Sequence, residues 1–396
     1  MSVADTHVGV ASSRPVLIVF SHLRWNFVFQ RPQHLLTRAA VDHDVFFIEE
    51  PLFDALANGF REETQAGGIC VIQPLLALGT SPDDAIKHQR MIAQTVAVRA
   101  GLRPIYLWYY TPLALAFSRD IPADLVIFDK MDELSAFDFA PPELQSVETE
   151  LMAKADLVFT GGASLHAAAI GRNPEVHCFP SSIDAAHFGE ARWGDNVDPS
   201  DQFEIGYPRV GFFGVIDERI DQTLIAEVAA LRPDWQLIMV GPCAKIDPAR
   251  LPQAANIHWL GARSYGDLPA YMAHWTLGWM PFARNAATEF ISPTKTPEFL
   301  AAGLPLLSTP IRDVVEPYGR LGLVEIADSA VAMVAAGDRL LAETSQRDSR
   351  LAAIDAHLSG NSWDVTWADM HSLIVAAASV SSVANPAAHR AEAGHV

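Results

Sequence analysis

Short, nearly continuous apolar segments recur along the chain and alternate with segments whose apolar residues are spaced as on one face of a helix. Apolar runs rich in Val, Ile, Leu and Phe are typical of parallel strands buried on both faces of a sheet. Because helical segments separate most of these runs, the pattern predicts an α/β protein. The expected strands are 16–22, 44–51, 68–76, 104–112, 124–134, 156–162, 175–184, 209–217, 235–242, 256–261, 277–282, 304–310 and 322–327.

The alternation of strands and helices is interrupted at 189–208, where glycine, proline and acidic residues are frequent. We interpret this segment as a linker between two domains, 15–188 and 209–362, each expected to be a Rossmann-like, doubly wound parallel sheet. A final helical segment at 363–380 is a candidate for crossing back onto the N-terminal domain. Ligands of such sheets bind beyond the carboxyl ends of the strands, so we expect the functional site in a cleft between the domains.

Composition and charge narrow the class of protein. Half of the residues are hydrophobic and 19% are charged, as in a well-packed globular protein. The formal net charge of −19 argues against a nucleic-acid partner and against broad adhesion to anionic lipid. Cys70, Cys178 and Cys243 lie far apart, which predicts neither a disulfide framework nor a metal cluster. With no signal-peptide pattern and no apolar run of membrane-spanning length, the sequence predicts a cytoplasmic protein.

The stretch 291–303, ISPTKTPEFLAAG, has the pattern of a loop that leads into a helix and ends at a glycine. Ser292 and Pro293 fit the cap and the first position of that helix. Helix capping does not explain the presence of Lys295 and Glu298. A lysine near a helix start can bind a diphosphate, and a carboxylate can accept two hydrogen bonds from a ribose diol. Two interpretations stay open: a nucleotide-sugar site, or a charged pair on a solvated helix face.

Polar and aromatic side chains gather in the loop after the first strand. A sugar can be bound there by stacking and by hydrogen bonds to its hydroxyl groups. We take His22 as a candidate catalytic residue, and Arg24, Trp25, Asn26 and Arg31 as candidate acceptor ligands. The alternative for Trp25 is that its aromatic ring fills the core and does not bind the acceptor.

The expected strand at 124–134 ends in a cluster of acidic residues, Asp129, Asp132 and Glu133. Asp129 is a candidate catalytic carboxylate, and the cluster as a whole could orient an acceptor hydroxyl or the donor sugar. For Asp132 and Glu133, capping of the next helix is the alternative. The sequence offers no triad of His, Cys and Asp at ligand spacing, so we predict no metal site.

Several motifs, in their order along the chain, resemble those of GT-B glycosyltransferases of the broad retaining group often called family 4 or group 1. SPTKTPEFLAAGLPLLST resembles this group's pattern SPxKxxEYLAxGxPVxST, and GFFGVIDERID at 211–221 resembles its first strand and phosphate loop. SHLRWNFVFQRPQHLL, DKMDELSAF, DLVFTGGASL and FPSSIDAAHF resemble a bacterial subgroup of the same transferases. The resemblance covers roughly residues 15–380 and implies the GT-B fold, with two Rossmann-like domains facing across a cleft.

The resemblance implies a donor site in the C-terminal half. Glu298 matches the acid that holds the donor ribose, and Gly214 would let the backbone approach the donor phosphates. Arg219 falls at the basic position of the phosphate loop, and Lys295 is a second candidate contact of the diphosphate. We also expect Arg219 and Lys295 to act in catalysis. The expected donor-binding residues are Ser292, Thr294, Lys295, Glu298, Gly214 and Arg219.

The chain departs from the family's pattern at three positions. Phe290 stands where the first of the family's two paired acids is expected, with Glu289 one residue out of register. Val215 stands in place of an arginine after the loop glycine, and a histidine after the fourth N-terminal strand is replaced within 108–112.

From the resemblance we expect a metal-independent glycosyltransferase that moves a sugar from a UDP- or GDP-linked donor to an acceptor hydroxyl, with retention and without a cofactor. A saccharide or lipid-linked acceptor in cell-envelope or exopolysaccharide synthesis is expected by analogy, with peripheral membrane contact at most. The sequence does not predict an oligomeric state. A nucleotide-sugar epimerase or hydrolase, and a non-catalytic scaffold subunit, remain alternatives.

Overall fold

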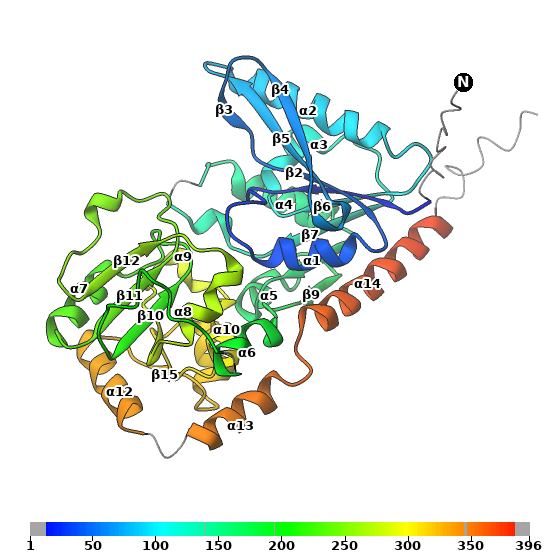
Figure 1. Cartoon of the computed structure of the whole chain (residues 1–396). Coiled ribbons are helices and arrows are strands. Elements are labelled where there is room, and N and C mark those ends of the chain that lie inside the picture. Colours follow the sequence, from blue (N-terminus) through cyan, green and yellow to red (C-terminus); the bar gives the residue numbers. More distant parts are fainter. Residues whose placement is uncertain (1–12, 139, 194, 344–346, 385–396) are drawn as a thin grey trace, which may run out of the picture.

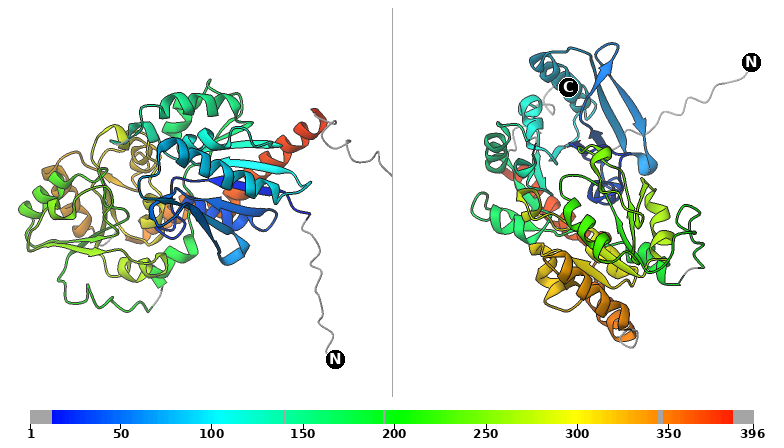
Figure 2. Two further views of the ribbon diagram at one scale, coloured as in Figure 1. Left: turned by 90° about the horizontal axis from the view of Figure 1, so that it is seen from above. Right: turned by 90° about the vertical axis from the view of Figure 1, so that its left-hand side faces the viewer.

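The structure, a computed structural model, describes residues 13–384 except 139, 194 and 344–346. Two sheets of mostly parallel strands, each packed against helices, form two domains that lie against each other (Figure 1; Figure 2). The predicted fold class of two Rossmann-like α/β domains is therefore confirmed.

The N-terminal sheet has nine strands within the described residues. Eight of them follow the order β3-β5-β2-β1-β6-β7-β8-β9 in parallel pairs, and β4 pairs antiparallel with β5. The chain order reverses between β1 and β6, which opens a crevice at the carboxyl ends of these strands. The strands are β1 (Val16–Phe20), β2 (Asp44–Ile48), β3 (Leu52–Ala55), β4 (Gly59–Thr64), β5 (Cys70–Ala77), β6 (Ile105–Tyr109), β7 (Leu125–Lys130), β8 (Leu157–Thr160) and β9 (Val176–Cys178).

The C-terminal sheet has six parallel strands within the described residues, in the order β12-β11-β10-β13-β14-β15. Its chain order reverses between β10 and β13, so a second crevice faces the first across the domain interface. The strands are β10 (Arg209–Phe213), β11 (Gln236–Val240), β12 (Ile257–Gly261), β13 (Leu277–Met280), β14 (Leu306–Ser308) and β15 (Glu325–Ile326).

Helices cover both sheets. They are α1 (Arg31–Ala39), α2 (Pro82–Val98), α3 (Leu115–Ser118), α4 (Leu144–Lys154), α5 (Ala163–Ala169), α6 (Ala185–Trp193), α7 (Gln222–Leu231), α8 (Leu268–Met272), α9 (Ala286–Glu289), α10 (Lys295–Ala301), α11 (Arg312–Val314), α12 (Ala330–Ala342), α13 (Arg347–Leu358) and α14 (Trp363–Ala384).

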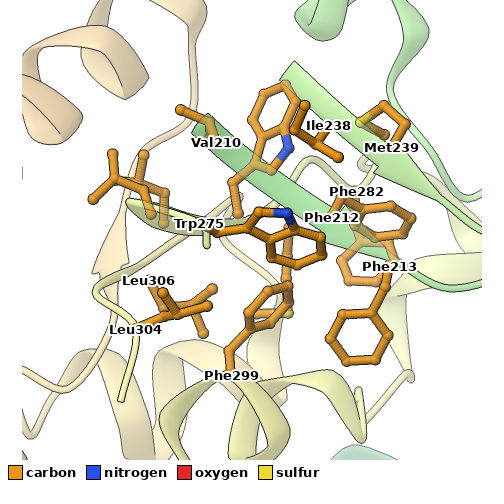
Figure 3. Close-up of a cluster of buried hydrophobic side chains, with 14 of the residues drawn as sticks. Val210, Phe212, Phe213, Ile238, Met239, Trp275, Phe282, Phe299, Leu304 and Leu306 are labelled. Carbon is orange, nitrogen blue, oxygen red and sulfur yellow. The ribbon is translucent and has the colours of Figure 1, made fainter. Parts of the chain in front are cut away.

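Two glycines in the C-terminal sheet let large aromatic side chains lie flat on its strands. A Cβ on Gly211 would approach the ring of Trp275 to 2.0 Å, and a Cβ on Gly278 would approach Phe299 to 2.5 Å. Figure 3 shows Trp275 and Phe299 packed together beside Phe213. Because Phe299 belongs to α10, this packing fixes the start of that helix at the carboxyl edge of the sheet.

Helix α14 returns to the N-terminal domain and packs against α1, β7 and β8 (Figure 1). Its apolar residues Trp363, Trp367, Met370 and Ile374 belong to the same buried cluster as Leu17 and Trp108. The ring of Trp363 stacks on His34 at 4.5 Å, and Arg38 forms an ion pair with Asp364 at 2.6 Å. The N-terminal domain is thus built from both ends of the described chain.

The structure differs from the expected boundaries in three places. The expected linker at 189–208 begins inside α6, which packs against α8 and α10 because Phe188 is buried in the C-terminal core. The expected strand at 124–134 ends at Lys130. Strands β3 and β4 were not predicted, because the segment GFREET at the sheet edge is polar and half exposed and lacks an apolar run.

Candidate active site

A cavity lies between the two domains, at the carboxyl ends of both sheets. Segments that follow β1, β7, β8 and β9 form its N-terminal wall. Segments that follow β10, β11 and β12, together with the start of α10, form its C-terminal wall. Its polar lining residues are Gln30, Arg31, Asp132, Ser181, Arg219, Arg263, Tyr265, Ser292, Thr294, Lys295 and Glu298.

Lys295 lies in this cavity at the start of α10, and a glycine makes room for it. Gly214, directly after β10, has a φ of 134°, and a Cβ there would lie 2.0 Å from Cε and 2.6 Å from Nζ of Lys295. Burial and the neighbouring charge of Arg219 lower the pKa of Lys295. The ion pairs found among the described residues do not involve Lys295, so its charge is available to an anionic ligand.

Glu298 lies about one turn further along α10 and lines the same cavity, with 8% of the residue exposed. Burial raises the pKa of Glu298 to about 7, although the nearby Lys295 opposes this shift. Of the two interpretations that the sequence left open for these residues, the structure excludes a solvated helix face. The two charged side chains instead face a cavity at the edge of the sheet.

The raised pKa of Glu298 predicts a pH dependence of stability. The Glu298 carboxyl keeps its proton up to about pH 7 in the folded protein, whereas in the unfolded chain it releases the proton near the ordinary glutamate pKa of 4.5. The free energy of unfolding should therefore fall as the pH rises from about 4.5 through 7, by on the order of 3 kcal/mol.

Denaturant unfolding of the wild type and of Glu298→Gln at pH values from 4.5 to 8 would measure this fall. The variant should lack it, and the control Glu289→Gln, which changes an exposed glutamate nearby, should retain it. Parallel pH profiles for the wild type and Glu298→Gln would contradict the prediction.

Arg219 lines the cavity in a fixed orientation. Its Nε donates to both carboxylate oxygens of Asp217, at 3.0 and 3.1 Å, and its Nη2 donates to Oδ2 at 2.7 Å. The ring of Phe137, from the N-terminal domain, lies 5.7 Å from the guanidinium carbon and 4.8 Å from Nζ of Lys245. The guanidinium is thus held rigidly with Nη1 left for a ligand, as recognition of a phosphate requires.

Ser292 and Thr294 line the cavity, but the cap expected at Ser292 is not formed. Helix α10 begins at Lys295, and Thr294 precedes it without a side-chain cap hydrogen bond. Ser292 contacts the other domain instead: its carbonyl oxygen accepts a hydrogen bond from the Ser181 hydroxyl at 3.3 Å. A Cβ on Gly162 would approach that of Ser292 to 2.6 Å, so the two domains touch closely here.

Asp129 and Arg31 form a buried ion pair beneath the cavity wall. Arg31 Nε donates to both oxygens of Asp129 at 3.1 Å, and its Nη1 donates to the Phe179 carbonyl at 2.8 Å. Asp129 is fully buried and does not line the cavity, whereas Arg31 does. Asp129 therefore orients Arg31 and has no access to a substrate, which corrects its expected catalytic role.

The structure does not bring the other predicted acceptor residues into the cavity. Trp25 is buried against Phe47, with ring centroids 5.1 Å apart. Arg24 donates to the carbonyl oxygen of Glu50 at 3.2 Å, and Asn26 is exposed. The prediction that Trp25 binds the acceptor is therefore wrong, because its indole fills the core.

His22 lies outside the cavity lining but close to the interface between the domains. Burial and the charge of Lys245, which comes from the C-terminal domain, lower the pKa of His22 to about 4. Its Nδ1 is buried without a hydrogen-bond partner. The imidazole is therefore neutral at pH 7. The predicted catalytic role of His22 stays a prediction.

Sequence reasoning missed several residues of the cavity. Tyr265 lines it from the turn before α8, with its ring 4.7 Å from that of Phe29 and 4.3 Å from that of His187. Asp132, which the sequence left between a capping and an orienting role, lines the N-terminal wall. Gly241 lay within the expected strand 235–242, and its position after an apolar run was a usable signal.

The structure offers two further findings on its described part. No group of three or more His, Cys, Asp and Glu residues is placed to hold a metal ion there. Over the same residues, none of the helices combines the length and the apolar character that crossing a membrane requires.

Comparison with known sequences places part of this chain in a family. Residues 207–343 match the family described as Glycosyl transferases group 1. A protein of Bacillus subtilis strain 168 that carries the name teichuronic acid biosynthesis glycosyltransferase TuaH is 27% identical over 222 residues. This alignment covers 51% of the present chain and 55% of TuaH, so the chain spans about half the length of that relative.

Solved structures match nearly the whole chain at low sequence identity. An α,α-trehalose 6-phosphate synthase from Burkholderia multivorans is 13% identical, with a TM-score of 0.66 over 94% of this chain and 99% of that one. Anabaena HepE, solved in complex with UDP and glucose, is 15% identical, with a TM-score of 0.63 over 91% and 100% of the two chains. The protein therefore has the GT-B fold, and the match of residues 207–343 to a glycosyltransferase family agrees with the resemblance found in the sequence.

Proposed function

We propose that this protein transfers a sugar from a nucleotide-sugar donor to an acceptor hydroxyl group. The observation that carries the proposal is the grouping of Lys295, Arg219 and Glu298 in one cavity at the carboxyl ends of the C-terminal strands. Two cations suit a diphosphate, and a carboxylate suits a ribose diol. HepE was solved with UDP and glucose, which supports a UDP-linked donor, with GDP as the alternative nucleotide.

In the proposed reaction the bond between the anomeric carbon and the diphosphate oxygen breaks as the acceptor oxygen bonds to that carbon, and the proton of the acceptor hydroxyl passes to the leaving diphosphate. Negative charge then grows on the leaving diphosphate, where Lys295 and Arg219 stabilise it. Closing the two walls around both substrates supplies their positioning. The proposed mechanism uses no metal or cofactor, and retention of configuration follows from the family resemblance.

The proposed setting is a cell-envelope or exopolysaccharide pathway in the cytoplasm, with a saccharide or lipid-linked acceptor. It rests on the similarity to TuaH, which is named for teichuronic acid biosynthesis. Contact with a membrane would be peripheral.

Calorimetric titration with UDP, GDP, dTDP, ADP and CMP tests the donor site. The wild type should bind one nucleoside diphosphate selectively, and Glu298→Ala should bind it about 10- to 100-fold more weakly, because a charged hydrogen bond to the ribose is lost. Glu289→Ala is the matched control, since Glu289 is exposed and outside the cavity lining.

Equal binding by the wild type and Glu298→Ala would refute the assignment of Glu298. Absence of binding to all five nucleotides would favour a non-catalytic scaffold subunit over an enzyme. Consumption of a nucleotide sugar at the same rate with and without acceptors would favour an epimerase or hydrolase.

A further inference from the structure

Three of the six charged side chains that line the cavity form ion pairs, and the other three are informative. Arg31 pairs with Asp129, Arg219 with Asp217, and Arg263 with Asp201. Among the described lining residues, this leaves three charged side chains without an ion pair: Lys295, Glu298 and Asp132. Lys295 and Glu298 stand on the same helix and interact electrostatically with each other. Asp132 is therefore the one unpaired charge of the N-terminal wall in the described structure.

Asp132 follows the end of β7 by two residues, and its local surroundings do not neutralise it. The nearest cation along the chain, Lys130, donates to Glu148 at 2.6 Å and forms an ion pair with Glu133 at 2.9 Å. No hydrogen bond from a described residue reaches the Asp132 side chain, so it does not cap the helix that follows. The carboxylate is thus held toward the cavity without a structural partner.

Keeping this carboxylate in place is costly for the fold. Burial raises the pKa of Asp132, and the negative charge of Asp217 acts in the same direction. Arg219 and Lys245, both from the opposite domain, only partly offset the cost. A partly buried charge in a cavity that pairs with no residue of the fold is a mark of a binding site.

The chemistry of the ligand follows from the wall on which Asp132 stands. A carboxylate only accepts hydrogen bonds, so it repels a phosphate and binds hydroxyl groups. The residues proposed for the donor all lie on the C-terminal wall, whereas Asp132 shares its wall with Gln30 and Phe29. Arg31 also lines this wall, but Asp129 already neutralises its charge. An amide and an aromatic ring beside a carboxylate are suited to a sugar.

We propose that Asp132 binds the acceptor by accepting hydrogen bonds from its hydroxyl groups, and that the acceptor is a sugar without an anionic group at this end. The inference rests on the proposed function and adds to it the chemical class of the acceptor. It applies to binding and orientation, and it leaves the stereochemistry of transfer open.

Saturation-transfer difference NMR tests the proposal. The wild type, saturated with the nucleoside diphosphate that it binds best, is titrated with glucose, galactose, mannose, N-acetylglucosamine and glucose 6-phosphate. At least one uncharged sugar should bind, and glucose 6-phosphate should bind more weakly than glucose. Asp132→Ala should weaken the binding of the uncharged sugar about tenfold or more, with nucleotide affinity within twofold of the wild type.

Two further variants separate binding from folding. Asp132→Asn preserves the volume of the side chain and removes its charge, so it should raise the thermal stability while weakening the binding of the sugar. Asp138→Ala removes an exposed aspartate from the same loop, outside the cavity lining, and should leave both quantities unchanged.

Three results would overturn the proposal: equal sugar binding by Asp132→Ala and the wild type, preference for glucose 6-phosphate, or no sugar binding to a wild type that binds nucleotide. A fourth would be an Asp132→Ala variant that loses affinity for the nucleotide sugar and keeps affinity for the nucleotide, since Asp132 would then contact the donor. A wild type that binds no nucleotide would instead count against the proposed function.

Discussion

Gly241→Ala is expected to destabilise the protein by about 3 kcal/mol or more and to abolish nucleotide binding. Gly241 directly follows β11 and has a φ of 148°, a conformation that side chains other than glycine rarely adopt. A Cβ there would lie 1.8 Å from the carbonyl oxygen of Gly214. Because the clash is with backbone, no side-chain movement can relieve it, and one of the adjacent strand ends has to shift.

Denaturant unfolding of Gly241→Ala beside the wild type measures this loss, and calorimetry with the nucleotide measures its effect on the site. Gly206→Ala is the control, since a Cβ at Gly206 would meet no atom within 4 Å. An unfolding free energy of Gly241→Ala within about 1 kcal/mol of the wild type would show that the two strand ends can separate without cost.

Lys295→Ala is expected to weaken the binding of a nucleoside diphosphate by about 2 kcal/mol, or roughly 30-fold. The lysine is the cation of the cavity that has no ion-pair partner among the described residues, so the variant loses a charge-assisted contact that Arg219, already paired, cannot replace. The thermal stability of the Lys295→Ala variant should not fall together with its nucleotide affinity. Burial lowers the pKa of Lys295, which means that the unliganded fold gains nothing from its charge.

Calorimetry and thermal unfolding of the same samples separate these two effects. Lys87→Ala serves as the matched control, because Lys87 is exposed and pairs with Asp84 on the surface of α2. If Lys295→Ala lost stability and kept its nucleotide affinity, the lysine would be a structural residue.

Much of the fold could be predicted from the sequence because its central strands are fully apolar. The strand VLIVF in β1 is buried at every position, and such a run has few alternatives to a central parallel strand. The edge strands β3 and β4 could not be predicted in the same way, since β3 has only four residues and β4 is polar and largely exposed. At a sheet edge the backbone pairing with β5, and not a hydrophobic pattern, determines the strand.

The positions of the candidate site residues could be predicted where local sequence determines them, and could not where tertiary contacts do. Lys295 and Glu298 share one short helix, so their spacing alone placed them together. The pairing of Arg31 with Asp129 joins residues 98 positions apart in the sequence, and no local pattern shows it. Because the sequence does not reveal this distant pairing, Asp129 was predicted to be a catalytic carboxylate.

The return of α14 to the N-terminal domain affects how the protein is made. A ribosome releases the chain from its first residue, so β7, β8 and α1 emerge long before the helix that covers them. Until the final helix appears, the surface that receives Trp363, Trp367, Met370 and Ile374 is open to water. The whole C-terminal domain is synthesised in that interval and can fold on its own core. The domain that begins first is therefore completed last, and a ribosome that stalls late leaves an exposed apolar surface for chaperones to bind.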